Sequence, residues 1–223
     1  MKKRVLAFVL AIALVCSLYG CDGKSQKAFE VSKSAYQKID VAYELTERFS
    51  EDIHEAWRMG IYDEDEIQEN GISYLTNELN LTEEEFRAGF GCLWSELSVE
   101  EWNALTEEEK SEYCDSWNLA ALFTDSLFSL CVQTVMSAYA VKGDVAIAQN
   151  ALDEAKTMMR ELSEKYSDYE HYPNLKGYYT TTSSFFTYCQ SPTGNFEAMN
   201  TTITNYKNEA RDYISDLDCI FED

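Results

Sequence analysis

Apolar residues recur every three or four positions in three long segments of the chain, the spacing of a helix with one buried face. Glycine (9) and proline (2) are scarce for 223 residues, and strong two-residue alternation is absent. The pattern therefore predicts helices joined by short turns. The three apolar stripes are Ala35, Ile39, Ala42, Thr46, Phe49, Ile53, Ala56 and Gly60; Ala148, Ala151, Ala155, Met158, Leu162 and Tyr166; and Phe196, Met199, Ile203, Tyr206, Ala210, Tyr213, Leu217 and Ile220.

Helices of this kind bury their stripes against one another, so the predicted fold is all-α, an antiparallel helical bundle. Turn residues separate the expected helices at two places. In Lys142-Gly143-Asp144, the glycine is expected to end one helix and the aspartate to cap the next. Residues 192–195 are expected to join helices over 174–189 and 196–221.

Residues 63–112 are more broken, and they contain three helix-start signals. In a capping box, a hydroxyl residue and a glutamate three positions later satisfy the free N–H groups of a helix N-terminus. The pattern occurs at 82–85, 98–101 and 106–109. Acidic first turns also suit the positive end of the helix dipole, which explains much of the acidity here without a metal site.

The segment Asn118 to Val141 is the most apolar stretch after the N-terminus. Asp125, Gln133 and several hydroxyl residues interrupt it, and an ionised aspartate near a bilayer centre costs several kcal/mol. We therefore expect a central helix buried in the bundle. The ordinary explanation of Asp125 is that its carboxylate accepts a hydrogen bond from a Tyr, Ser or Thr hydroxyl of a neighbouring helix. If Asp125 faces the core beside a cavity, it is instead a candidate ligand-binding carboxylate.

The N-terminus has the zones of an export signal. Lys2, Lys3 and Arg4 precede an apolar core, Val5 to Leu18, which is shorter than the roughly 20 residues needed to span a membrane. The closing residues Leu18-Tyr19-Gly20-Cys21 resemble the lipobox of bacterial lipoproteins, apart from the bulky Tyr19. That resemblance implies cleavage after Gly20 and a diacylglycerol on the Cys21 thiol. The alternative is ordinary cleavage after Ser17, which would release a secreted protein.

The resemblance implies a domain organisation and a cellular location. Residues 1–20 are the expected signal peptide, 21–28 the lipidated cysteine and a short polar tether, and 29–223 a single helical-bundle domain. The expected location is the extracytoplasmic face of a bacterial cell membrane, held there by lipid on Cys21. Beyond the lipobox, the chain resembles uncharacterised helical lipoproteins of bacteria only in its general helical pattern.

The charge is strongly acidic, with a formal net charge of −22. Residues 51–141 carry 21 acidic side chains against Arg58, Arg87 and Lys110. Such a surface repels nucleic acid and anionic lipid head groups, so no nucleic-acid partner is expected. A cationic partner stays open beside the simpler reading of a solvated surface.

The cysteines and histidines carry no recognisable motif. Five cysteines remain beyond Cys21, none at CxxC spacing, and most fall on apolar stripes, which predicts buried thiols. Cys189 and Cys219 are expected at opposite ends of their hairpin, about 35 Å apart, too far for a disulfide. A bridge between Cys92 and Cys114 is left open, as is the state of Cys131. The two histidines, His54 and His171, are expected to be solvent-exposed.

No catalytic, metal or cofactor motif is present. Asp63 and Asp65 begin like a calcium loop, but Ile67 and Gln68 replace a ligand and the required glycine. No phosphate loop or nucleophile elbow occurs, so we expect neither an enzyme nor a bound cofactor. A cluster of tyrosines at 166–179 predicts core packing, with an exposed sticky patch as the alternative.

Two functional hypotheses follow. The first is a membrane-anchored interaction module that presents a helical face to a protein or envelope partner. The second is a small-molecule or ion sensor with a pocket near Asp125.

Overall fold

The computed structural model describes residues 2–115 and 128–221, with side chains described from residue 23 onward except at 64, 68, 114–115 and 128–129. All regular structure in these ranges is helical, which confirms the predicted all-α fold. The helices are α1 (Lys2–Tyr62), α2 (Glu64–Asn70), α3 (Ile72–Asn77), α4 (Glu83–Ser95), α5 (Val99–Ala104), α6 (Glu107–Asp115), α7 (Phe128–Lys142), α8 (Asp144–Lys165), α9 (Tyr172–Gln190) and α10 (Phe196–Phe221).

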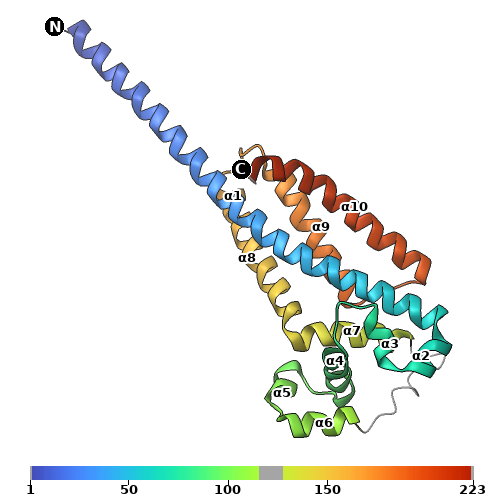
Figure 1. The fold of residues 1–223 in the computed structure, drawn as a ribbon. Coiled ribbons are helices and arrows are strands. Elements are labelled where there is room, and N and C mark those ends of the chain that lie inside the picture. The colour runs from blue at the N-terminus through green and yellow to red at the C-terminus, as the bar shows by residue number, and fades with distance from the viewer. Residues whose placement is uncertain (1, 116–127, 222–223) are drawn as a thin grey trace.

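The long helices form an antiparallel bundle around α1 (Figure 1). Lys38 pairs with Glu154 and Arg48 with Asp144, so α8 runs opposite to α1. Contacts of α10 with α1 run in the same opposed sense, from His54–Phe196 at one end to Tyr36–Asp218 at the other. Helix α9 runs parallel to α1, because Asp40 contacts Tyr178 and Thr46 contacts Cys189.

The predicted stripes form the seam of this bundle. The α1 stripe is buried from Ala35 to Ala56, and the α8 and α10 stripes are buried or packed against the same core. Aromatic rings fill the space between α1, α9 and α10, where Tyr178 is fully buried beside Tyr36 and Tyr43. The bundle therefore follows directly from the three-four spacing.

The short helices α2 to α6, residues 64–115, gather at the end of the bundle where α1 finishes, and we call this group the far lobe (Figure 1). Helix α4 joins the far lobe to the bundle by packing on α7. The two backbones approach so closely that a Cβ at Gly89 would lie 2.4 Å from the Ala138 nitrogen. Glycine at 89 is thus a requirement of the packing.

The capping predictions are confirmed, with one correction. Thr82 and Ser98 form complete capping boxes with Glu85 and Glu101, and Thr106 exchanges the same hydrogen bonds with Glu109. At the 142–144 turn, however, Gly143 with φ 95° occupies the N-cap position of α8. Asp144 is therefore the first helical residue, and its carboxylate contacts cations of neighbouring elements rather than capping the helix.

Residues 22–28, the expected tether, are helical. They continue α1 without interruption, and Ala28 is already buried against the bundle. Apart from Gly23, the segment has no helix breaker, and its lysines, glutamine and alanine favour a helix.

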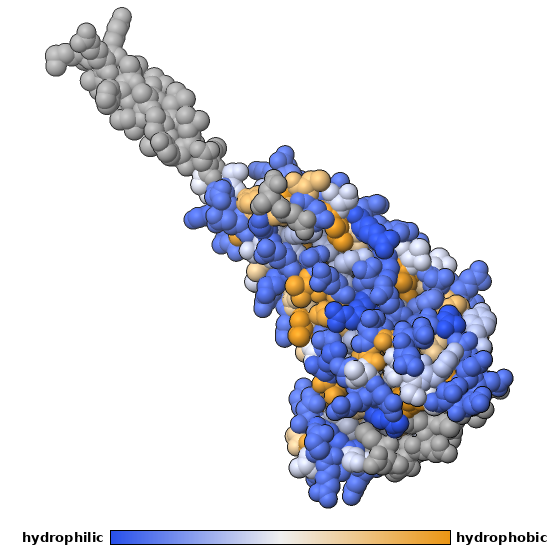
Figure 2. All heavy atoms as spheres, in the orientation of Figure 1, coloured by the Kyte–Doolittle hydropathy of each residue, from blue (hydrophilic) through white to orange (hydrophobic). Residues whose placement is uncertain are grey.

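The apolar segment predicted over 118–141 is described from Phe128 onward as α7, which packs between α1 and α4 as expected of a central helix. Among the side chains that the structure describes, no helix has the length and apolar character needed to cross a membrane. Hydrophilic residues cover most of the face drawn in Figure 2, with apolar residues scattered between them.

Candidate functional site

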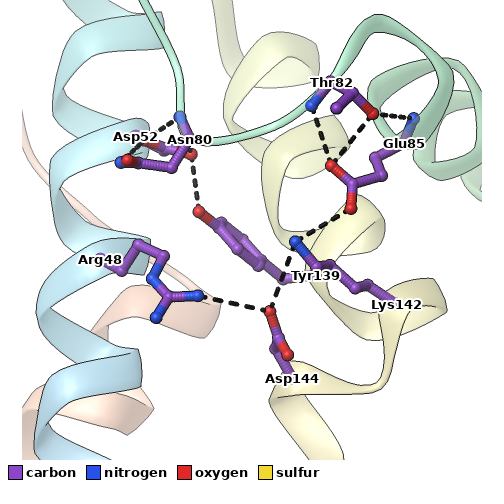
Figure 3. A network of polar contacts seen from close by, with 8 residues as sticks. All are labelled: Arg48, Asp52, Asn80, Thr82, Glu85, Tyr139, Lys142 and Asp144. Carbon is purple, nitrogen blue, oxygen red and sulfur yellow. Dashed lines mark hydrogen bonds and ion pairs between the residues drawn. The ribbon is translucent and has the colours of Figure 1, made fainter.

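Asp52 is the only buried acidic or basic residue among the side chains that the structure describes, with 1% exposure. It lies on α1 between Phe49 and Ala56 of the stripe, so the helical period turns it inward. The backbone N–H of Asn80 donates to both carboxylate oxygens, at 3.0 and 3.1 Å, and the Asn80 side chain donates at 2.8 Å. The Tyr139 hydroxyl donates to Oδ2 at 2.7 Å (Figure 3).

These partners come from three parts of the fold. Asp52 belongs to α1, Asn80 to the link between α3 and α4, and Tyr139 to α7, where its ring packs on Phe49 at 4.5 Å. Burial raises the pKa of the Asp52 carboxyl, and the donors from Tyr139 and Asn80 oppose that shift. Burial and the adjacent carboxylate also raise the pKa of Tyr139. The carboxylate thus fastens the far lobe to the bundle.

A chain of ion pairs lies beside Asp52 (Figure 3). The Lys142 ammonium contacts Glu85 at 2.9 Å and Asp144 at 4.0 Å, and Arg48 contacts Asp144 at 3.9 Å. Burial alone would raise the pKa of Glu85, but hydrogen bonds from Thr82 and Lys142 outweigh it and lower that pKa. Through Glu85, the capping box of α4 is connected to the end of α7.

A polar hollow of about 490 Å³ adjoins Asp52 between α1, α10 and the residues that precede α4. Its walls carry Glu51 and Glu55 of α1, Asn200 and Thr204 of α10, and Glu78. Lys207 reaches across from α10 to α1, 2.9 Å from Glu51 and 3.4 Å from Glu47. The hollow is therefore negative with one cation at its edge, an environment suited to a small polar ligand bearing an amino group.

The two histidines are half-buried rather than exposed, which corrects the sequence prediction. His54 lines the hollow and packs on Phe196, with ring centroids 4.9 Å apart. Burial lowers its pKa, so it is mostly neutral near pH 7. His171 precedes α9 and lies 3.2 Å from Glu170. The helical periodicity could not predict the contact of His54 with Phe196, because the two residues are far apart in the sequence.

Other predicted residues fall as follows. Asp125 and the Cys21 side chain lie outside the described residues. Asp63 precedes α2 and pairs with Arg58 at 3.0 Å. Within the described side chains, no group of three His, Cys, Asp or Glu residues is placed to hold a metal ion.

The thiols follow the prediction in three of the four described cases. Cys92, Cys131 and Cys189 are buried and free, whereas Cys219 is free and exposed. Burial raises the pKa of Cys131 to about 12 and also raises that of Cys189, so these thiols are unreactive at neutral pH. The Cys114 side chain lies outside the described set.

Asp52 was missed by sequence reasoning although a signal existed. It stands three residues after Phe49 and four before Ala56, positions that share the buried face of a helix. Its partners could not be found in the same way, because Asn80 and Tyr139 are 28 and 87 residues away.

The chain matches no protein-family model, and comparison with curated proteins and with solved structures likewise gives no match.

Proposed function

We propose that the protein is a bacterial lipoprotein, anchored through lipid on Cys21, whose bundle serves as an interaction module outside the cytoplasm. The observation that carries this proposal is the course of α1. It is one helix from the residues of the lipobox to the far lobe. At 1.5 Å per residue, the 41 residues from Cys21 to Tyr62 hold the far lobe about 60 Å from the anchor.

The distribution of charge supports a specific orientation. Residues 51–115, the end of α1 and the far lobe, contain 20 acidic and three basic residues. An anionic membrane surface repels such a lobe, and the repulsion is strong only within about 10 Å. A stiff helical spine keeps the lobe beyond that range. The partner that fits this surface is a protein with a basic patch.

Site-specific photocrosslinking in native membranes tests this function. A photoreactive residue at Glu108, exposed in the far lobe, should capture a discrete partner, and the same residue at Glu209, exposed on α10, should not. The yield of the adduct should fall with added salt and with the substitution Glu100→Lys. Identical adducts from both positions, or none from Glu108, would contradict the proposal.

A second candidate is a sensor for a small polar molecule, favoured by the hollow beside Asp52 rather than by Asp125. Its test is a thermal-shift screen of small amines on the purified chain, repeated with Lys207→Ala and Thr204→Val. A stabilising amine whose effect disappears in these variants supports the sensor. No shift with any amine argues for the interaction module alone.

A further inference from the structure

A second hollow, of about 440 Å³, lies at the opposite end of the bundle from the far lobe. One wall is formed by α1, which contributes the exposed side chains of Lys24 and Ser25 and the buried Ala28. The volume falls in the range of pockets that hold small ligands, about 300–1,000 Å³. Because most of its lining is exposed, the hollow is open to a ligand from outside the bundle.

The other wall is the turn between α8 and α9. It contributes two half-buried rings and two exposed carboxylates, those of Tyr166, Tyr169, Asp168 and Glu170. The Tyr169 hydroxyl faces the buried Ser32 hydroxyl, so this residue offers its ring to the hollow and not its hydroxyl. Tyrosine rings attract cations, and carboxylates accept hydrogen bonds from ammonium groups. This wall therefore suits an ammonium group.

The two walls carry opposite charges. The α1 wall has the ammonium of Lys24, whereas the turn has the carboxylates of Asp168 and Glu170. Asp168 accepts a hydrogen bond from the neighbouring Ser167 hydroxyl at 3.4 Å. Glu170 lies 3.2 Å from the adjacent His171. Both carboxylates thus make their contacts within their own turn, and the hollow keeps a positive and a negative side.

The hollow also lies close to the expected membrane anchor. Lys24 is three residues after Cys21 in α1, which is about 4.5 Å along the helix axis. With lipid on Cys21, the hollow is therefore at the level of the lipid head groups. That position rests on the proposed function, whereas the charges and rings of the lining do not.

We propose that this hollow binds the head group of a zwitterionic phospholipid that carries a primary ammonium. The phosphodiester pairs with Lys24 and accepts a hydrogen bond from the Ser25 hydroxyl. The ammonium group donates hydrogen bonds to Asp168 and Glu170 beside the tyrosine rings. A head group held in this way fixes the orientation of the bundle on the membrane, with the far lobe directed away from it.

The opposed walls select a zwitterion over a ligand of one charge. An anionic head group without an ammonium leaves both carboxylates of the turn unmatched and is repelled by them. A simple amine leaves Lys24 unmatched and is repelled by it in the same way. Only a ligand with a phosphate at one end and an ammonium at the other matches both walls.

Native mass spectrometry of the full chain in a neutral detergent tests the inference. The chain is titrated with dihexanoyl phosphatidylethanolamine and with dihexanoyl phosphatidylglycerol, which share acyl chains and phosphate but differ in the ammonium. The first lipid should bind about tenfold more tightly than the second. Glycerophosphoethanolamine, the same head group without acyl chains, should bind more weakly than the lipid. The intact mass also shows whether Cys21 carries a diacylglycerol.

Charge reversals locate the binding. Lys24→Glu and Asp168→Lys should each weaken binding of phosphatidylethanolamine about tenfold, because each replaces an attraction with a repulsion. Lys27→Glu and Asp153→Lys are the matched controls, since they make the same changes at exposed positions of α1 and α8 outside the lining. The controls should stay within about twofold of the parent. All four positions are exposed, and circular dichroism verifies that each variant remains helical.

The outcomes separate this inference from the proposed function. Equal binding of the two lipids, or equal losses in the lining variants and their controls, would overturn the head-group site and leave the lipoprotein proposal standing. Equal affinity for the lipid and for glycerophosphoethanolamine would overturn the assignment to a membrane lipid. Selective binding by a chain without diacylglycerol would support the site and count against anchoring through Cys21.

Discussion

At the scale of single residues, the stability of the molecule depends most clearly on Asp52. Its carboxylate accepts hydrogen bonds from Asn80 and Tyr139 while being almost fully removed from solvent. The far lobe is thus held through a group whose burial is unfavourable and whose hydrogen bonds offset that cost. Changes at this residue are expected to depend on pH.

Asp52→Asn should destabilise the fold by about 1–3 kcal/mol, because an amide nitrogen replaces an oxygen that accepts hydrogen bonds. The loss should be larger near pH 4 than near pH 7. A raised folded-state pKa means that the Asp52 contribution is greatest below the ordinary value of 3.8 and is lost as pH rises through the folded pKa. Asparagine does not titrate, so the difference in unfolding free energy between the parent and Asp52→Asn narrows as pH rises. Urea unfolding at both pH values measures it, and a gap that widens toward pH 7 would refute the assigned direction.

Tyr139→Phe keeps the ring that packs on Phe49 and removes only the donor to Asp52. We expect a loss of about 1.5–3 kcal/mol at pH 7, the range for a hydrogen bond to a charged group. Tyr43→Phe is the matched control, because its hydroxyl makes only a 3.5 Å contact with Glu47. Equal losses in the two variants, measured by thermal unfolding, would show that the Asp52 contact contributes nothing special.

At the scale of the helices, the sequence predicted more than it did at the scale of contacts. The stripes of α1, α8 and α10 and the three capping boxes were visible because their information is local: a three-four spacing, or a hydroxyl followed by a glutamate. Three features were not visible in the sequence: the helical conformation of residues 22–28, the place of Asp144 as the first residue of α8, and the pairing of His54 with Phe196. Each depends on which distant element lies beside the residue, and a one-dimensional pattern does not contain that information.

Thr82→Ala should lower the free energy of unfolding by about 0.5–2 kcal/mol, because it removes the side-chain acceptor that caps α4. Glu85 would then keep its ion pair with Lys142 but lose its hydroxyl partner in the capping box. Thr201→Ala is the control, since Thr201 is exposed within α10 and bonds only to the carbonyl of Glu197. That control should lie within about 0.5 kcal/mol of the parent. Chemical denaturation gives both values, and a neutral Thr82→Ala would mean that the capping box is not formed in solution.

Gly89→Ala should loosen the far lobe, because the added methyl meets the backbone of Ala138 and forces α4 away from α7. Overpacking of this kind costs about 1–3 kcal/mol. Gly23→Ala, with nothing within 4 Å of the added Cβ, is the control. Hydrogen exchange should show faster exchange in α4 of the Gly89 variant only. Unchanged protection there would contradict the close approach of the two helices.

At the scale of the whole molecule, the fold has two unlike ends joined by one helix. The far lobe is acidic and consists of short helices. At the opposite end of the bundle, a hollow lined by Tyr166 and Tyr169 lies beside the N-terminal part of α1. The fold class and the turns between long helices could be predicted from the sequence. The polar hollow beside Asp52 could not, because α1, α10 and the link before α4 come together only in the folded chain.

The proposed membrane location depends on Cys21 becoming the lipid-bearing first residue of the mature protein. Mass spectrometry of the N-terminal peptide from the purified membrane form tests it most directly. We expect a peptide that begins at Cys21 and carries a thioether-linked diacylglycerol, and we expect this peptide to be absent from the Cys21→Ala protein. A mature chain that begins at another residue, with an unmodified N-terminus, would contradict lipid anchoring through Cys21.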